Sequence, residues 1–272
     1  MGESVIEWTD DVWNPIVGCK ACSPGCLNCY AARLASTRLA RLPQYRGLTE
    51  DGKWTGKWNF NDAYRNSDWN KETFGRKPRR IFVCSMGDLF YEAIKTLWIT
   101  SVMKCIINEH NRHHTFILLT KRAERMAEVL ADYKLPANVW CGVSICNQEE
   151  LKEKLPHLAK VNAAVQFISF EPMLERIGFW DLRLCRLDWL IIGCESLAGK
   201  KAGRLPPALS GVEGDGFIDA TTEIVTCSKP YGVPVFVKQI PIGGKIERDV
   251  TRFPKQLQRQ EWPGRAITGS AE

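Results

Sequence analysis

Six short apolar runs recur between residues 80 and 237 of this chain. They are rich in β-branched and aromatic residues and nearly continuous in apolar character, which is typical of parallel strands covered on both faces. Segments with helical patterns lie between several of them, and this alternation predicts an α/β fold with a parallel sheet. Six strands, with one or two more before residue 80, suit a partial (β/α) barrel better than a complete eight-fold barrel. The predicted strands cover 80–84, 115–119, 138–143, 165–169, 189–193 and 233–237, and the predicted helices 94–110, 121–133, 148–160 and 218–228.

The length of 272 residues is normal for one α/β barrel, so we expect a single domain over 1–272. No apolar run approaches the roughly 20 residues that span a bilayer. The acidic start of the chain has no apolar core like that of a signal peptide, so we expect a cytoplasmic protein without membrane contact. Within the domain we expect an irregular aromatic-rich insertion at 44–77, a mobile loop at 199–216 and a peripheral tail at 254–272.

Four cysteines lie within eleven residues, in a Pro- and Gly-rich segment at 13–31, ahead of a helix predicted over 30–42. Thiolates this close can converge on one soft metal centre. Cys19, Cys26 and Cys29 have the spacing C-x6-C-x2-C, and Cys22, Cys26 and Cys29 have the spacing C-x3-C-x2-C. Cys26 and Cys29 are therefore common to both patterns, and whether Cys19 or Cys22 is the third ligand stays open. Other cysteines lie on apolar segments and are predicted to be small buried thiols, namely Cys84, Cys141, Cys185 and Cys194.

Polar side chains follow each of the six predicted strands. The carboxyl ends of parallel strands meet at one edge of the sheet, where α/β proteins hold their active sites. Each residue also has a structural alternative to an active-site role. A single polar residue at a strand end could be a helix cap, and Lys238 could form a buried ion pair with Glu171. Six ends in succession favour an active-site mouth, and a first strand over 12–17 would bring the cysteines to it. The residues are Ser85, Gly87, Asp88, Thr120, Lys121, Arg122, Ser144, Ser169, Glu171, Glu195 and Lys238.

Eight ordered phrases of the chain resemble the phage-associated three-Cys-motif family, a domain of unknown function. That family is similar to compact radical SAM enzymes, which bind a [4Fe-4S] cluster on a partial barrel. The resemblance implies a cluster held by three cysteines and S-adenosyl-L-methionine as second cofactor, and the family spacing favours Cys19 over Cys22. Asn28 and Cys194 depart from the usual patterns. The phrases are WNP at 13–15, SPGCxxCYA at 23–31, FVCSMGDLF at 82–90, LTKR at 119–122, WxGVS at 140–144, FEPML at 170–174, DWxxxGxES at 188–196 and FVKQ at 236–239.

The resemblance also implies roles for the polar strand ends. Ser85, Gly87 and Asp88 would hold the methionyl amino group of the cofactor. Lys121, Arg122 and Glu171 would contact its carboxylate and ribose or the substrate. Glu195 and Lys238 would close the site. The catalytic residues would be Lys121, Glu171, Glu195 and Lys238. The cofactor-binding residues would be Ser85, Gly87, Asp88, Thr120, Arg122, Ser144 and Ser169.

Three functions stay open. The first is a radical SAM-type enzyme that acts on a nucleotide or nucleic acid, which the phage setting of the family and the formal charge of +6 favour weakly, with or without a partner protein. The second is an α/β hydrolase or nucleic-acid-binding module with a structural zinc ion on all four cysteines. The third is a non-catalytic nucleic-acid binder that uses the aromatic and basic stretch 54–80.

Overall fold

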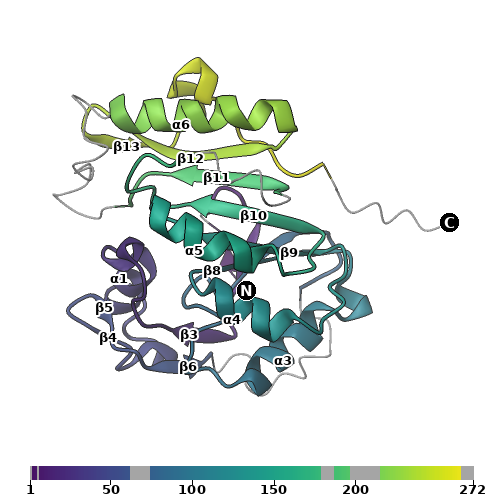
Figure 1. Cartoon of the computed structure of the whole chain (residues 1–272). Helices are drawn as coiled ribbons and strands as arrows, with labels where there is room; N and C mark the ends of the chain where they lie inside the picture. Colours follow the sequence, from purple (N-terminus) through teal and green to yellow (C-terminus); the bar gives the residue numbers. More distant parts are fainter. Residues whose placement is uncertain (1, 5, 62–73, 179–186, 197–214, 265–272) are drawn as a thin grey trace.

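Seven parallel strands, β2 and β7 to β12, form the centre of the molecule in the computed structural model, which describes residues 2–4, 6–61, 74–178, 187–196 and 215–264 (Figure 1). The strand order is β1-β2-β7-β8-β9-β10-β11-β12-β13, and the two outermost strands pair antiparallel with their neighbours. The predicted α/β fold with a mostly parallel sheet is confirmed. In the described part of the chain the two edges of the sheet do not pair, so no closed barrel forms. The strands are β1 Gly2–Glu3, β2 Asp11–Trp13, β7 Arg80–Val83, β8 Thr115–Thr120, β9 Val139–Ser144, β10 Val165–Phe170, β11 Trp189–Gly193, β12 Val235–Ile242 and β13 Lys245–Glu247.

Helices connect most of the parallel strands and cover one face of the sheet. Their buried faces join one set of strand side chains in the larger hydrophobic core. The α-helices are α1 Tyr30–Ser36, α3 Thr96–Ile106, α4 Ala123–Leu130, α5 Gln148–Leu158 and α6 Asp215–Ser228. The helices α1, α3, α4 and α5 end earlier than their apolar patterns predict, whereas α6 ends at Ser228 as predicted. The 3-10 turns are η1 Pro24–Cys26, η2 Pro43–Tyr45, η3 Glu109–Asn111, η6 Lys229–Tyr231, η7 Val250–Arg252 and η8 Lys255–Leu257.

The opposite face of the sheet carries an aromatic cluster without any helical residue among its buried members. Trp8 packs against Phe82 of β7 and Trp189 of β11, with ring centroids 4.9 Å and 6.2 Å away. Because β8, β9 and β10 lie between those two strands, the sheet curves around this cluster. Gly142 of β9 leaves room for it, since a Cβ there would lie 2.5 Å from the Phe167 ring.

The N-terminal segment differs from the single strand predicted over 12–17. Asn14 and Pro15 separate β2 from β3, Ile16–Gly18, which leaves the main sheet and pairs antiparallel with β6, Trp58–Phe60. A small core forms there around Val17, with α1 and the hairpin of β4, Thr49–Glu50, and β5, Lys53–Trp54. Part of the predicted insertion at 44–77 is therefore a satellite core, and residues 62–73 lie outside the described part.

The C-terminal segment lies closer to the core than a peripheral tail would. Leu257 is fully buried, Gln260 forms a β-bridge with Phe236, and the Trp262 ring packs on Phe236 with centroids 5.0 Å apart. The tail beyond residue 264 and the predicted loop 199–216, apart from its last two residues at the start of α6, lie outside the described residues.

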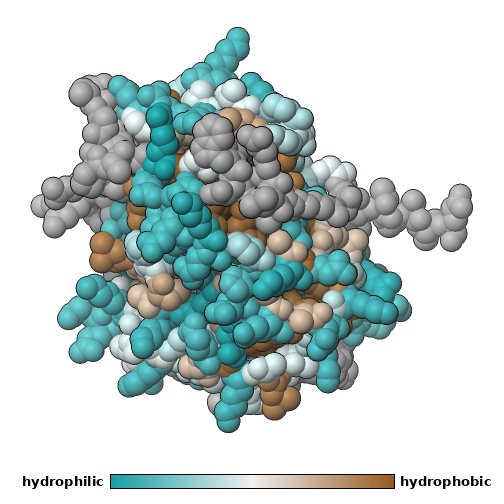
Figure 2. Space-filling view, in the orientation of Figure 1, coloured by the Kyte–Doolittle hydropathy of each residue, from teal (hydrophilic) through white to brown (hydrophobic). Residues whose placement is uncertain are grey.

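The described helices are all too short or too polar to cross a membrane. On the face in Figure 2 hydrophilic residues dominate, and hydrophobic residues form small separate patches. Among the most exposed large hydrophobic side chains is Leu27, in the cysteine segment. Of the predicted buried thiols, Cys84, Cys141 and Cys194 are buried as expected, and Cys185 is outside the described residues.

Candidate metal and cofactor site

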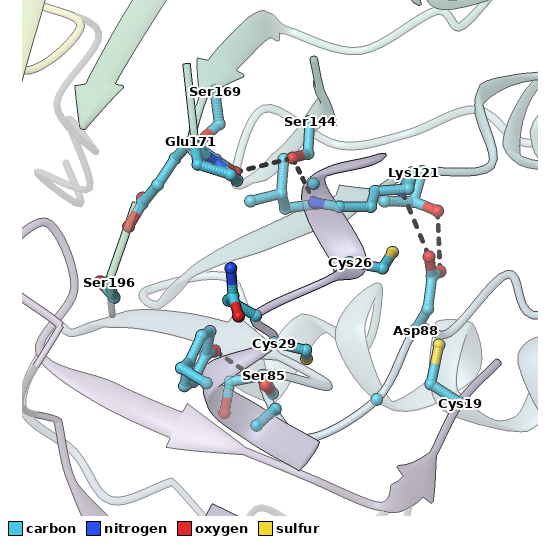
Figure 3. A pocket seen from close by; sticks show the side chains of 18 of the residues that line it. Cys19, Cys26, Cys29, Ser85, Asp88, Lys121, Ser144, Ser169, Glu171 and Ser196 are labelled. Carbon is cyan, nitrogen blue, oxygen red and sulfur yellow. Dashed lines mark hydrogen bonds between the residues drawn. The ribbon is translucent and has the colours of Figure 1, made fainter. Parts of the chain in front are cut away.

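The cysteine segment and the carboxyl ends of the strands line one pocket (Figure 3). All the predicted site residues contribute to it except Cys22. In Figure 3, Ser144, Ser169 and Glu171 lie on one side of the pocket, and the sulfur atoms of Cys19 and Cys29 lie across from them. An apolar wall completes the lining, and it includes Ile6, Trp8, Trp54, Phe82 and Leu119.

The period of two in a β-strand explains why the strand ends face this pocket. Phe167 belongs to the aromatic cluster, and Ser169 is the next residue of β10 on the same face. Phe236 and Lys238 have the same relation in β12. The polar residues therefore continue the concave aromatic face of the sheet, and the cluster forms the floor beneath them.

The cysteines lie at the borders of short elements. Cys19 follows β3, Cys26 ends η1, and Cys29 directly precedes α1. Ser23 caps η1, where its hydroxyl accepts a hydrogen bond of 3.1 Å from the Gly25 N–H. This turn explains why the segment folds back within so few residues.

The four thiols are free and differ in exposure. Cys22 is exposed, whereas Cys19, Cys26 and Cys29 are half-buried. A hydrogen bond from Cys22 lowers the pKa of Cys26 to about 5 against the effect of burial, and the Lys121 ammonium adds to this shift. Cys22 is thus a neighbour of Cys26 without lining the pocket.

The side chains that line the pocket are of the kinds that hold an iron–sulfur cluster and a polar ligand. Thiolates are the protein ligands of such clusters. The Ser169 hydroxyl is fully buried and has no hydrogen-bond partner among the described residues, so it is free to bind a ligand. In the described part of the chain, no three Cys, His, Asp or Glu side chains already gather as a site for a single metal ion.

Asp88 is buried and its carboxylate is engaged by the protein. Oδ1 accepts hydrogen bonds from the Thr120 hydroxyl (2.7 Å) and the Phe90 N–H (3.0 Å). Oδ2 accepts from the Lys121 N–H (3.2 Å) and from Nη1 of Arg122 (3.0 Å). These bonds give Asp88 a structural role, in which it positions the end of β8, and its expected contact with the cofactor amino group stays a prediction.

Arg122 is also buried, and its described partners lie in the cysteine segment and on neighbouring acidic side chains, while its expected contact with the cofactor carboxylate stays a prediction. Its Nη2 donates to the Lys20 carbonyl (2.8 Å), and Nη1 lies 3.6 Å from the Cys19 sulfur. Its Nε donates to both carboxylate oxygens of Glu92, at 2.8 Å and 2.9 Å. Arg122 thus connects the end of β8 to the loop that carries Cys19.

Two lysines lie on the side of the pocket formed by β8 to β12. Nζ of Lys121 donates to the Ser144 hydroxyl (2.6 Å), which in turn donates to the Glu171 carbonyl (3.1 Å). Lys238 forms an ion pair with the Glu171 carboxylate. The ion pair expected as an alternative to an active-site role for these two residues is therefore present. Both side chains still line the pocket.

Ser85 and Gly87 contact the N-terminal segment. Asn14 Oδ1 accepts hydrogen bonds from the Ser85 hydroxyl (3.1 Å) and the Met86 N–H (2.9 Å). The backbone of Gly87 forms a bridge with Gly18, and a Cβ on Gly87 would lie 2.8 Å from the Gly18 carbonyl oxygen. These contacts hold the start of the cysteine segment against the end of β7. Ser85 and Gly87 also line the pocket.

The remaining predicted residue, Glu195, follows the end of β11 and reaches the cysteine segment. Its carboxylate accepts a hydrogen bond of 2.8 Å from the Asn28 amide. Asn28, which departs from the usual motif of the cysteine segment, therefore has a hydrogen-bond partner at the mouth of the pocket. Gln239 donates to the Cys194 carbonyl and the Ser196 hydroxyl, which fixes the end of β11.

Several residues of the site were not singled out from the sequence, chiefly Asn14, Lys20 and Glu92. Asn14 had a signal, because it lies in the WNP phrase of the family. Lys20 contributes a backbone carbonyl, and Glu92 is an ordinary acidic loop residue, so no sequence pattern marks either.

Behind the cysteine segment lies a buried ion pair between Glu150 and Lys154, 2.8 Å apart. Glu150 also accepts from the Cys146 N–H, and Lys154 donates to the Ser144 carbonyl. Burial alone would raise the pKa of Glu150, but Lys154 and the Ser23 hydroxyl hold it below 4.5. The pair therefore connects Ser23, the residue that caps η1, to the C-terminal end of β9.

We expect Glu150→Gln to lower the free energy of unfolding by about 3 kcal/mol at pH 7, because it leaves the Lys154 charge buried and unpaired. Since the native pKa is below the unfolded one, the contribution of the carboxylate is present above about pH 4.5 and is lost as the pH falls further. Urea unfolding of both proteins between pH 7 and pH 3.5 measures this. A gap that stays constant with pH would contradict the assigned ion pair.

These features define a class of protein, a mixed α/β chain in which a cysteine-rich segment and the ends of a mostly parallel sheet line one pocket. The chain belongs to the family described as "Protein of unknown function (DUF5131)", whose model matches residues 3–268. The expected membership in a family of unknown function is thus confirmed over nearly the whole chain. Searches of curated proteins and of solved structures gave no match.

Proposed function

We propose that this protein is a radical SAM-type [4Fe-4S] enzyme. The observation that carries the proposal is the shared pocket, which Cys19, Cys26 and Cys29 line together with the polar ends of consecutive parallel strands. A cluster held by three thiolates keeps one iron free for S-adenosyl-L-methionine, whose reductive cleavage starts radical chemistry. The three cysteines would hold the cluster, and the strand ends would hold the second cofactor and the substrate.

The curvature of the sheet supports the finer fold assignment, a partial (β/α) barrel of the radical SAM kind. Helices cover the outer face, and the inner face surrounds the aromatic cluster beneath the pocket. A floor of this kind excludes water, which protects reactive intermediates from side reactions.

Two donors in the pocket suit a carboxylate- or hydroxyl-bearing ligand. Among the described residues, the Ser169 hydroxyl has no hydrogen-bond partner, and the Lys121 ammonium donates one hydrogen bond, to Ser144. An ammonium carries three donors, so Lys121 can hold a ligand oxygen while it keeps that bond. Lys238, Glu171 and Glu195 would act at the reacting substrate, which we propose to be a nucleotide or nucleic acid because of the charge of +6.

The test is anaerobic reconstitution with iron and sulfide, followed by addition of dithionite and S-adenosyl-L-methionine. We expect about four irons per chain, visible iron–sulfur absorption and formation of 5′-deoxyadenosine. A colourless protein after reconstitution would remove the proposal. One zinc ion per chain in the purified protein would favour the structural zinc site, for which the contact between Cys22 and Cys26 supplies a fourth thiol.

A further inference from the structure

One guanidinium joins the cysteine segment to the sheet. Arg122 donates to the Lys20 carbonyl, and its Nη1 lies between the Cys19 sulfur (3.6 Å) and Asp88 Oδ2 (3.0 Å). Its carbon Cζ also lies 4.9 Å from the centroid of the Tyr91 ring. The side chain is only 5% exposed, so this cation is held in place from several directions.

We propose that Arg122 is a positioning residue, which fixes Cys19 toward the pocket and raises the reduction potential of the cluster. The inference rests on the proposed function and adds to it a determinant of redox behaviour in this chain. It also gives a physical reason for Cys19 as third ligand, because Arg122 holds the backbone immediately after Cys19.

The positioning argument follows from the shape of the group. A guanidinium is planar, always charged and carries five donors in a fixed arrangement. Here these donors serve Glu92, Asp88, Lys20 and Cys19 together. A lysine offers a single ammonium, which cannot reach both the carboxylates and the cysteine loop in this way.

The electrostatic argument concerns the charge of the bound cluster. Hydrogen bonds to the ligand sulfurs, net charge and solvent exposure set the potential of an iron–sulfur centre. Reduction adds negative charge, which a buried N–H donor and cation next to Cys19 stabilise. Asp88 and Glu92 balance the charge of Arg122, but of these three side chains it is the guanidinium that has a hydrogen bond to the Cys19 sulfur, whose thiol also donates to the Lys20 carbonyl (3.5 Å).

The test compares Arg122→Gln with Arg125→Gln in the reconstituted full chain. Arg125 is the matched control, because it lies in the first turn of α4, of which Arg122 is the N-cap residue, and donates to the Ile94 carbonyl. We expect Arg122→Gln to make the potential more negative in an EPR-monitored titration. Its iron release to a chelator should be about ten to a hundred times faster, as is common when a group that orients a metal ligand is removed. Arg125→Gln should behave as the wild type.

Asp88→Asn/Arg122→Gln guards against unfolding, because it removes the unpaired carboxylate together with the cation. If the folded Arg122→Gln variant keeps the wild-type potential and release rate, or the folded double variant keeps the wild-type release rate, the inference is wrong. A wild-type protein that takes up no iron would instead remove the proposed function. Arg122→Lys separates charge from shape, and we expect it to restore part of the potential but not the slow iron release.

Discussion

Cys19→Ala is expected to remove the iron–sulfur absorption of the reconstituted protein, whereas Cys22→Ala leaves about four irons per chain. Both residues fit a three-cysteine spacing with Cys26 and Cys29, and the spacing of the family that the chain resembles favours Cys19. The structure separates them, because Cys19 lines the pocket and Cys22 is exposed outside it. A cluster with two thiolates loses one of the bonds that hold it, and we expect it to dissociate.

Iron and sulfide per chain, with the EPR spectrum of the reduced protein, measure the effect. Cys227→Ala is the matched control, since it removes a half-buried thiol on α6 that does not line the pocket. Loss of iron from Cys22→Ala with retention in Cys19→Ala would make Cys22 the third ligand and overturn the preference. Loss from both would show four ligands, and the free iron that the proposed enzyme needs would be absent.

Most of the sheet could be predicted from the sequence, because its strands are buried on both faces. β10 is an example, since every residue of Val165–Phe170 is buried and the run was predicted within one residue. Such a strand needs no partner information to be recognised. The gathering of strand ends at one pocket followed from the parallel direction alone, and the structure confirms it.

The path of the N-terminal segment could not be predicted, because long-range contacts determine it. The Asn14 amide oxygen meets the turn after β7, and β3 pairs with β6, about forty residues later. The partners of Arg122 could not be predicted either, because its contact with Cys19 joins residues 103 positions apart in the sequence. A strand-end arginine can point toward a ligand or toward a neighbouring loop, and periodicity does not distinguish these.

The second large effect is expected for Gly87→Ala, which should lower both stability and iron content. The added Cβ would lie 2.8 Å from the Gly18 carbonyl oxygen, a backbone atom that no side-chain rotation can move away. Gly18 itself has φ of +96°, and a Cβ there would lie 2.5 Å from the Lys57 carbonyl, so this strand cannot easily shift. We expect the free energy of unfolding to fall by about 1–3 kcal/mol.

Iron loss should exceed what this destabilisation explains, because Cys19 directly follows Gly18 and moves with it. Gly142→Ala is the matched control, since its Cβ would lie 2.5 Å from the Phe167 ring in the aromatic floor, away from the cysteine segment. Thermal unfolding of both apoproteins and iron content after reconstitution separate the two effects. We expect similar losses of stability but a retained cluster in Gly142→Ala. If both variants keep iron equally, the crossing of Gly87 and Gly18 does not position Cys19.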